Sequence, residues 1–257
     1  MERLEGKQCI KAALLARRRK IELILVSGNA HHDKTEEVVS LARLQNIPIK
    51  IVPPEELNAA AQGRTHGGLV AICSPKPLTP VDEVLRIIKK GNASPFLLLL
   101  EGVEDEQNLG FIIRSAGAMG VDAVLLKKHI WNFDPIAVSR ASAGAYEYLP
   151  LIKVEKSHDI ITPLRKSGIK IYGAISNARK TIYEINLTTG ILIALGGEKR
   201  GLSADVRERC DSFFSIPMHK GEVDKMESLS LSHSAAIIMA ETMRQRFYTL
   251  TPERPSE

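Results

Sequence analysis

The stretch that decides the fold is residues 191–203, ILIALGGEKRGLS. Its first five residues are all apolar, which is too short for a membrane span and typical of a strand buried on both faces. The run ends at Gly196 and Gly197, where the missing Cβ atoms let the backbone turn sharply or approach a ligand closely. In parallel sheets, ligands bind beyond the carboxyl ends of the strands. The sequence therefore predicts a site at these glycines.

The rest of the C-terminal part alternates between strands and helices. A short strand over 213–216 ends at Pro217, and a polar loop then leads to a helix over about 229–247. Such alternation predicts an α/β fold with a parallel sheet covered on both faces. The other strands are expected at 96–100, 123–126, 149–154 and 169–175, and the other helices at about 108–119, 134–142, 157–167 and 203–210.

The N-terminal part predicts a separate, small α/β sandwich. Three αβ repeats are expected before residue 74, with helices over 5–17 and 34–45 and a short one from Pro53, and strands at 21–26, 47–52 and 69–73. The segment SPKPLTP that follows carries three prolines, which disfavour regular pairing and stiffen a linker. We expect one domain over residues 1–75, a linker over 76–94 and a second domain over 95–257.

Composition narrows the class of protein. The chain has 257 residues and a net charge of +5, from 35 Lys and Arg against 30 Asp and Glu, a mild excess that suits a polyanionic partner. No apolar run approaches the roughly 18 residues of a membrane helix, so a cytoplasmic protein is expected. The three cysteines, Cys9, Cys73 and Cys210, are too far apart to suggest a disulfide framework or a metal site.

Two features of the N-terminal part are candidates for RNA contact. Arg17, Arg18, Arg19 and Lys20 form a run of four cations between the first helix and the first strand, which is either a solvated surface or a phosphate contact. His66 precedes two glycines that form a turn or let RNA approach closely.

Asn108 and Arg114 make the first candidate site of the second domain. Asn108 is at a position typical of a helix N-cap. Helical side chains lean towards the N-terminus, so Arg114 can reach back past Gly110 towards Asn108, and its fork of donors suits phosphate or carboxylate. The alternative is a surface arginine paired with an acidic neighbour.

Two further candidate sites follow later in the chain. Glu198, between glycines, is either solvated or a partner for an amide or cation. The serines at 228, 230 and 232 are either competing helix caps or site residues.

Taken together, these motifs resemble a known family. N-x-G-x-x-x-R at 108–114, SAGA at 142–145, LGGE-x-x-GL at 195–202, IPM at 216–218 and SLSLS at 228–232 occur in the order typical of SpoU-type RNA ribose 2′-O-methyltransferases, in the SPOUT superfamily. The resemblance covers about residues 95–247. The N-terminal part is similar to the RNA substrate-binding domain of the ribosomal-RNA branch, which resembles kink-turn-binding ribosomal proteins.

The resemblance implies a trefoil knot, a homodimer, S-adenosylmethionine as cofactor, no metal, and ribosomal RNA as substrate. It assigns catalysis to Asn108, Arg114, Glu198, Ser228 and Ser230, with Arg114 also contacting RNA. An arginine stays protonated at ordinary pH, so we expect Arg114 to act as an electrostatic clamp and not as a base. The cofactor residues it implies are Leu195, Gly196, Gly197, Gly201, Ile216, Met218, Leu229 and Ser230.

The chain departs from the family pattern at Ser230, where the family usually has asparagine, and in a longer loop over 221–227. His233 stands where the family more often has an apolar residue, and it is either a compensating base or a cap of the last helix. The alternatives are a transfer-RNA methyltransferase, or a catalytically silent RNA-binding or ribosome-assembly factor. A Rossmann-type methyltransferase needs its glycine-rich loop after the first strand of the sheet, where this chain has residues 101–107.

Overall fold

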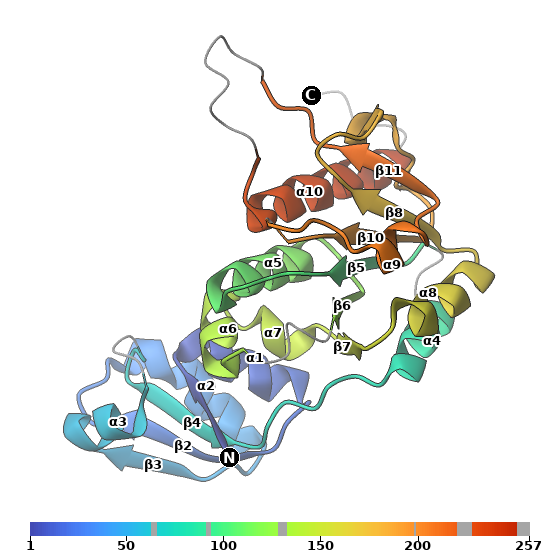
Figure 1. The fold of residues 1–257 in the computed structure, drawn as a ribbon. Coiled ribbons are helices and arrows are strands. Elements are labelled where there is room, and N and C mark those ends of the chain that lie inside the picture. The colour runs from blue at the N-terminus through green and yellow to red at the C-terminus, as the bar shows by residue number, and fades with distance from the viewer. Residues whose placement is uncertain (63–65, 91–93, 128–132, 198, 220–227, 251–257) are drawn as a thin grey trace, which may run out of the picture. The chain divides into compact units, whose positions relative to one another are not determined.

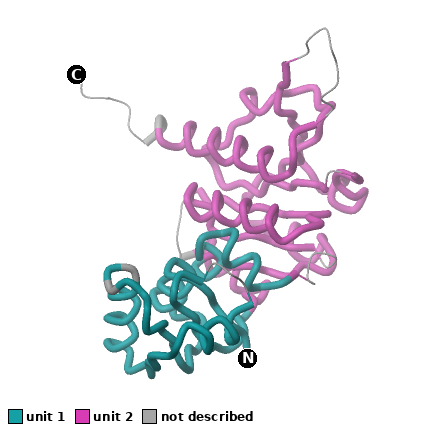
Figure 2. Tube along the Cα trace, turned by 90° about the vertical axis from the view of Figure 1, so that its left-hand side faces the viewer, with its two compact units in different colours: residues 1–77, 134–148 teal, residues 78–133, 149–257 magenta. Residues whose placement is uncertain are grey.

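A computed structural model describes residues 1–62, 66–90, 94–127, 133–197, 199–219 and 228–250. The chain divides into two compact units (Figure 2). The N-terminal unit comprises residues 1–77 and 134–148, and the C-terminal unit comprises 78–133 and 149–257. A stretch from the middle of the chain therefore folds with the N-terminal residues.

The N-terminal unit is built on a four-stranded sheet in the order β1-β4-β2-β3. Strand β4 is antiparallel to both of its neighbours, β1 and β2, whereas β2 and β3 are parallel. The sequence prediction missed β1, whose residues ERLE lack an apolar run. The strands are β1 (Glu2–Glu5), β2 (Ile21–Ser27), β3 (Ile49–Val52) and β4 (Leu69–Cys73), and the first three helices are α1 (Lys7–Ala16), α2 (His32–Leu44) and α3 (Pro54–Ala60).

Residues 134–148 add two short helices to this unit, α6 (Pro135–Ala141) and α7 (Ala145–Tyr148). The side chain of Arg19 is buried and donates to both carboxylate oxygens of Glu147, over 2.9 and 3.2 Å. Gly144 has a φ of +87°, and a Cβ there would lie 2.7 Å from the Cβ of Ala12. The predicted strand from residue 149 starts later because residues up to 148 are helical.

The C-terminal unit contains a seven-stranded sheet in the order β7-β6-β5-β10-β8-β11-β9, and all its pairs are parallel. This confirms the predicted α/β class. The strands are β5 (Phe96–Leu100), β6 (Ala123–Lys127), β7 (Leu151–Val154), β8 (Lys170–Ala174), β9 (Lys180–Thr181), β10 (Ile191–Leu195) and β11 (Ser212–Ser215). The helices are α4 (Val81–Lys90), α5 (Glu106–Ala118), α8 (Ser157–Lys166), α9 (Ala204–Arg207) and α10 (Leu231–Leu250).

Strand β10 occupies the centre of this sheet and is completely buried, as its apolar run predicts. It pairs with β5 on one side and β8 on the other, although β5 is nearly 100 residues earlier in the chain (Figure 1). Leu195 is level with Leu100 and with Ala174. The carboxyl ends of the three strands therefore meet at one edge, and the residues that follow them can form a common site.

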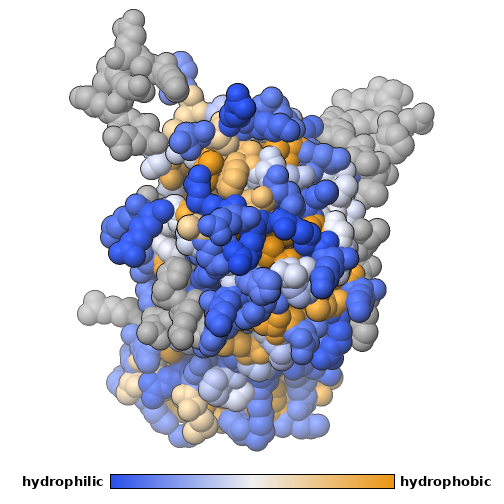
Figure 3. Space-filling model, turned by 45° about the vertical axis from the view of Figure 1, so that its right-hand side comes forward, coloured by the Kyte–Doolittle hydropathy of each residue, from blue (hydrophilic) through white to orange (hydrophobic). Residues whose placement is uncertain are grey.

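Helix α10 packs against α5 in the C-terminal unit. Ala235, Ile238 and Met239, which the helical spacing places on one face, are buried. No helix among the described residues meets the length and hydropathy needed to cross a membrane. Hydrophilic residues cover most of the face that Figure 3 shows.

Candidate functional site

A small cavity of about 270 Å³ opens beyond the carboxyl ends of β8, β10 and β11. Its walls combine main-chain groups at glycines with apolar side chains, and a few polar side chains, among them Asn177 and Arg207, complete the lining. Seven of the predicted cofactor-binding residues line it: Leu195, Gly196, Gly197, Gly201, Ile216, Met218 and Leu229. Residues that the sequence pattern selects from three separate segments therefore line one cavity.

Close backbone packing explains the glycines at this edge. The amide of Gly201 donates to the carbonyl of Gly197 over 2.8 Å, so these two glycines lie side by side, and Gly201 has a φ of +60°. A Cβ at Gly196 would overlap the carbonyl carbon of Gly201, and one at Gly197 would lie 2.8 Å from the Cα of Gly102. Side chains at these positions are excluded by the backbone itself.

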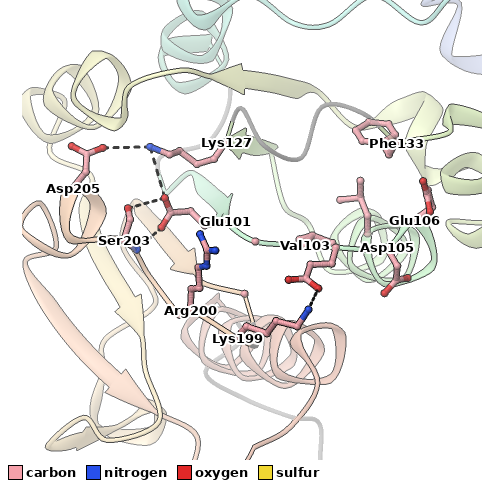
Figure 4. A pocket seen from close by; sticks show the side chains of 15 residues that line it. Glu101, Val103, Asp105, Glu106, Lys127, Phe133, Lys199, Arg200, Ser203 and Asp205 are labelled. Atoms are coloured by element: carbon pink, nitrogen blue, oxygen red, sulfur yellow. Dashed lines mark hydrogen bonds and ion pairs between the residues drawn. The ribbon is translucent and has the colours of Figure 1, made fainter.

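A larger cavity of about 770 Å³ shares Gly197 and Gly201 with the small one. Figure 4 shows its charged lining, which comes from the residues that follow or end β5 and β6 and from the segment after β10. Glu101 is only 4% exposed, and it accepts from the amide and the hydroxyl of Ser203, each over 2.9 Å. Lys127 lies between Glu101 and Asp205, at 3.7 and 3.3 Å.

Glu101, Lys127 and Ser203 were missed by the sequence prediction as site residues. The signal that could have found Glu101 and Lys127 is a charged residue directly at the carboxyl end of a buried apolar strand. The hydrogen bonds to Ser203 tie the segment after β10 to the end of β5. These contacts hold the wall that the two cavities share.

Asn108 is not the N-cap of α5, contrary to the prediction. Helix α5 starts at Glu106, and Asp105 caps it by accepting from the amide of Asn108 over 2.7 Å. The side chain of Asn108 instead links two elements. It donates to Asp105 over 2.7 Å, and it accepts from Ser232, at the start of α10, over 2.8 Å.

The other predicted catalytic residues differ in their position relative to the two cavities. Ser228 lines the small cavity, and Ser230 is hydrogen-bonded to Ser232 and His233. Arg114 is exposed on α5 and is absent from the lining of both cavities, and no hydrogen bond joins it to Asn108 among the described residues. Glu198 and the loop over 221–227 lie outside the described residues.

The predicted RNA-binding residues of the N-terminal unit differ in their exposure to solvent. Arg17, Arg18 and Lys20 are exposed. Arg19 is buried in its ion pair with Glu147, so its guanidinium is not accessible to RNA. The prediction of an RNA contact is therefore not supported at Arg19. His66 contacts Asn58 over 2.8 Å and accepts from the amide of Gly68 over 3.2 Å, as expected of a residue that shapes a turn.

Metal binding has no support in the part of the chain that the structure describes, where no group of three or more His, Cys, Asp or Glu side chains could hold an ion. The three cysteines are free thiols.

Comparison with known proteins agrees with this geometry. Residues 95–240 match the model of the SpoU rRNA Methylase family. Residues 3–79 match the model for RNA 2′-O ribose methyltransferase substrate binding. Since the first match covers more than half of the chain, this protein belongs to the SpoU rRNA methylase family.

Individual relatives extend the match over nearly the whole chain. The 23S rRNA (guanosine-2′-O-)-methyltransferase RlmB of Coxiella burnetii is 34% identical over 242 residues, covering 94% of each chain. The crystal structure of the SpoU methyltransferase AviRb from Streptomyces viridochromogenes with AdoMet has a TM-score of 0.77 and 24% identity, covering 95% of this chain and 90% of that one. An RNA 2′-O ribose methyltransferase structure has a TM-score of 0.74 and 25% identity, covering 95% and 88%.

Proposed function

We propose that this protein transfers the methyl group of S-adenosylmethionine to a ribose 2′-hydroxyl in structured RNA, with ribosomal RNA as the first substrate to test. The observation that carries the proposal is the pair of cavities that share Gly197 and Gly201. A cofactor in the small cavity and a nucleotide in the large one would meet at this glycine backbone. The relationship to the 23S rRNA methyltransferase RlmB supports the choice of ribosomal RNA.

The lining of the small cavity fits the cofactor. Ile216, Met218 and Leu229 offer apolar contacts to an adenine ring, and main-chain groups along the glycine segment can hydrogen-bond its edge and the ribose. Asn177 and Arg207 provide polar partners for the amino-acid end. When bound, S-adenosylmethionine supplies a methyl group already activated by the positive sulfur.

The protein must then orient the hydroxyl and help to remove its proton. Holding two reacting groups in line can by itself supply much of the acceleration. Arg114, exposed on α5, is proposed to hold a phosphate of the substrate and to favour the negative oxygen as it forms. Asn108 is proposed to fix the start of α5 relative to the serines of α10, and Glu198 and Ser228 are proposed to complete the polar shell.

Further parts of the proposal follow from the family. Arg17, Arg18 and Lys20 are proposed to attract the RNA backbone, and a homodimer, a trefoil knot and a cytoplasmic location are proposed with them. The position of β10 between β5 and β8 supports the knot, because a late strand returns to the centre of the sheet. We also propose that the domain boundaries are 1–75 and 95–257 with a linker between.

Isothermal titration with S-adenosylmethionine tests the first half of this function. Binding to the wild-type chain is expected, and no binding would favour an RNA-binding or assembly factor without activity. Mapping of 2′-O-methyl groups on ribosomal and transfer RNA, from cells with and without the gene, tests the second half. A missing methyl group in ribosomal RNA is expected, whereas one in transfer RNA alone would select the transfer-RNA alternative.

The variant Arg114→Lys is expected to lower turnover by about 100-fold, because an ammonium keeps the charge but loses the planar fork that holds a phosphate. Binding of S-adenosylmethionine should stay within about twofold of wild type, since Arg114 does not line the small cavity. Single-turnover methylation and titration calorimetry measure the two effects. Arg86→Lys, on exposed α4, is the control. Near-normal turnover of Arg114→Lys would refute the clamp.

A further inference from the structure

Five side chains from two elements form one hydrogen-bonded chain in the C-terminal unit. It starts at Asp105 and Asn108 of the α5 region, continues through Ser232 and Ser230, and ends at His233 on α10. The Oγ atoms of Ser230 and Ser232 are 3.1 Å apart, and Ser230 Oγ is 2.6 Å from Nδ1 of His233. The chain therefore ends on an imidazole, a group that can take up a proton near neutral pH.

The direction of the hydrogen bonds follows from Asp105. Its carboxylate accepts from the amide nitrogen of Asn108, so the amide oxygen of Asn108 faces Ser232 and must accept from its hydroxyl. Ser232 has then used its only proton, and its oxygen can only accept from Ser230. The single hydroxyl proton of Ser230 thus has two acceptors within reach, Ser232 Oγ and His233 Nδ1.

When the neutral imidazole of His233 carries its proton on Nε2, this arrangement is one proton short of giving every contact its own hydrogen; a proton on Nδ1 would fill every contact. With neutral His233, Ser230 donates to Nδ1 and no proton lies between the two serines. If one proton is added, His233 Nδ1 donates to Ser230, Ser230 donates to Ser232, and Ser232 donates to Asn108. With the proton of the neutral imidazole on Nε2, the network can therefore accept one proton at Ser230 without breaking any of its contacts.

The network adjoins both cavities, although Ser230 and His233 do not themselves line either of them. Leu229 and Leu231, on either side of Ser230, line the small cavity, as does Ser234 next to His233. Asp105, at the other end, lines the large cavity. Ser232 is buried whereas His233 is exposed, so a proton that reaches the imidazole can pass to water.

We propose that Ser230 and His233 together accept the proton of the ribose hydroxyl, an inference that rests on the proposed function. As the hydroxyl oxygen forms its bond to the methyl carbon, the bond from that carbon to sulfur breaks and its electron pair stays on sulfur. The hydroxyl proton passes to Ser230 Oγ, and the proton of Ser230 passes to His233 Nδ1. Ser230 is the catalytic residue here, and His233 is a positioning residue that acts through it.

Helix capping is the competing explanation for the same contacts. Ser230 Oγ also accepts from the amide of His233 over 3.3 Å, as an N-cap serine does with the third helical residue. Glutamine is a usual partner at that third position and can keep such a reciprocal cap, but it cannot take up a proton. His233→Gln therefore separates a role in proton transfer from a role in helix stability.

The experiment compares the full-length wild type with His233→Gln and His233→Ala. We expect His233→Gln to keep its melting temperature and its affinity for S-adenosylmethionine, while the single-turnover rate falls by about 100-fold, the usual scale for a lost general base. Free imidazole in the buffer should restore part of the rate of His233→Ala, which a purely structural role would not allow. Ser230→Ala should lose rate to the same extent, and imidazole should not restore it.

A second histidine with a similar contact gives the matched control. His158 Nδ1 is 3.1 Å from the hydroxyl of Thr162 on the exposed side of α8, and neither residue lines the small or the large cavity. His158→Gln should methylate at the wild-type rate. A rate for His233→Gln within about twofold of wild type, or a loss that imidazole does not rescue, would overturn the proposal.

A further measurement separates this inference from the proposed function. If the wild type neither binds the cofactor nor methylates RNA, the proposed function fails and the proton acceptor fails with it. If the wild type is active, only the His233 variants decide. Nitrogen NMR of the free protein adds a readout without turnover: the proposal requires neutral His233 to carry its proton on Nε2, and a proton on Nδ1 would overturn it, because Ser230 would then have no acceptor at the imidazole.

Discussion

Replacing Glu147 with glutamine is expected to destabilise the N-terminal unit by about 3 kcal/mol, because it deprives a buried guanidinium of one of its two charged partners. The side chains of Arg19 and Glu147 are 0% and 1% exposed, and two hydrogen bonds join them. Arg19 keeps a contact with Glu2 over 2.8 Å and with the carbonyl of Ser74 over 3.2 Å, which limits the loss. Without Glu147, most of the cost of burying the charge remains uncompensated.

A change in the charge of Lys76 does not compensate for the lost pair. Burial lowers the pKa of Lys76 to about 7, since desolvation disfavours its charged form, although Glu147 works in the opposite direction. Removal of the Glu147 carboxylate would therefore favour neutral Lys76 even more. Ser139 donates to Glu147 over 3.3 Å, and a glutamine can keep that bond. The predicted loss is thus assigned to the charge and not to the shape of the side chain.

Hydrogen exchange of strands β2 and β4 in the full chain measures this loss, because it reports opening of the N-terminal unit by itself. The control is Glu56→Gln, which removes an exposed pair with Lys50 at 2.7 Å in the same unit and should cost under about 1 kcal/mol. The double variant Arg19→Met with Glu147→Leu should recover much of the stability, since an apolar pair can replace a buried ion pair. Equal protection in Glu147→Gln and wild type would contradict the argument.

The same ion pair shows where sequence patterns stop being informative. Arg17, Arg18, Arg19 and Lys20 are four adjacent cations, and nothing in their order distinguishes the buried one. The partner of Arg19 is 128 residues away in the chain. Only the folding of residues 134–148 with the N-terminal unit brings the two charges together.

Strands with continuous apolar runs were predictable to the residue. The bounds of β4, β5 and β10 agree with the prediction because burial on both faces requires such runs. Strand β1 has an acidic residue at each end and gains its place from the antiparallel ladder with β4, a long-range pairing that has no local signal. The cap of α5 was misplaced for a different reason, since Asp105 and Asn108 both suit an N-cap.

The two cavities also differ in how far their linings could be predicted from the local sequence. The small one could be predicted because glycines, an Ile-Pro-Met segment and a serine-rich helix start form a recognisable set. The lining of the large one depends on Glu101 and Lys127, which follow or end different strands. Glu101 meets Ser203, and Lys127 meets Asp205, only when β10 enters the sheet between β5 and β8. The glycine segment can therefore be recognised from local composition, whereas the charged side chains beside it are brought together only by the order of the strands in the sheet.

Replacing Gly196 with alanine is expected to weaken binding of S-adenosylmethionine at least 100-fold, or about 2.7 kcal/mol, because the added Cβ would overlap the backbone of Gly201. A flexible side chain could move aside, but the carbonyl carbon of Gly201 and the amide nitrogen of Leu202 cannot move without the segment after β10. Gly196, Gly201 and Leu202 all line the small cavity. The shift that relieves the overlap therefore changes the shape of the cofactor site.

Titration calorimetry of Gly196→Ala measures this effect, and hydrogen exchange of β10 checks that the sheet remains folded. Gly28→Ala is the matched control, since a Cβ there would meet its nearest atoms, the carbonyl oxygen of Val52 and a methyl of Ile51, at 3.7 and 3.8 Å, which is ordinary contact. It should bind the cofactor like wild type. If Gly196→Ala binds S-adenosylmethionine within a few-fold of wild type, the small cavity is not the cofactor site, because a displaced wall at residues 201 and 202 could not leave a bound ligand undisturbed.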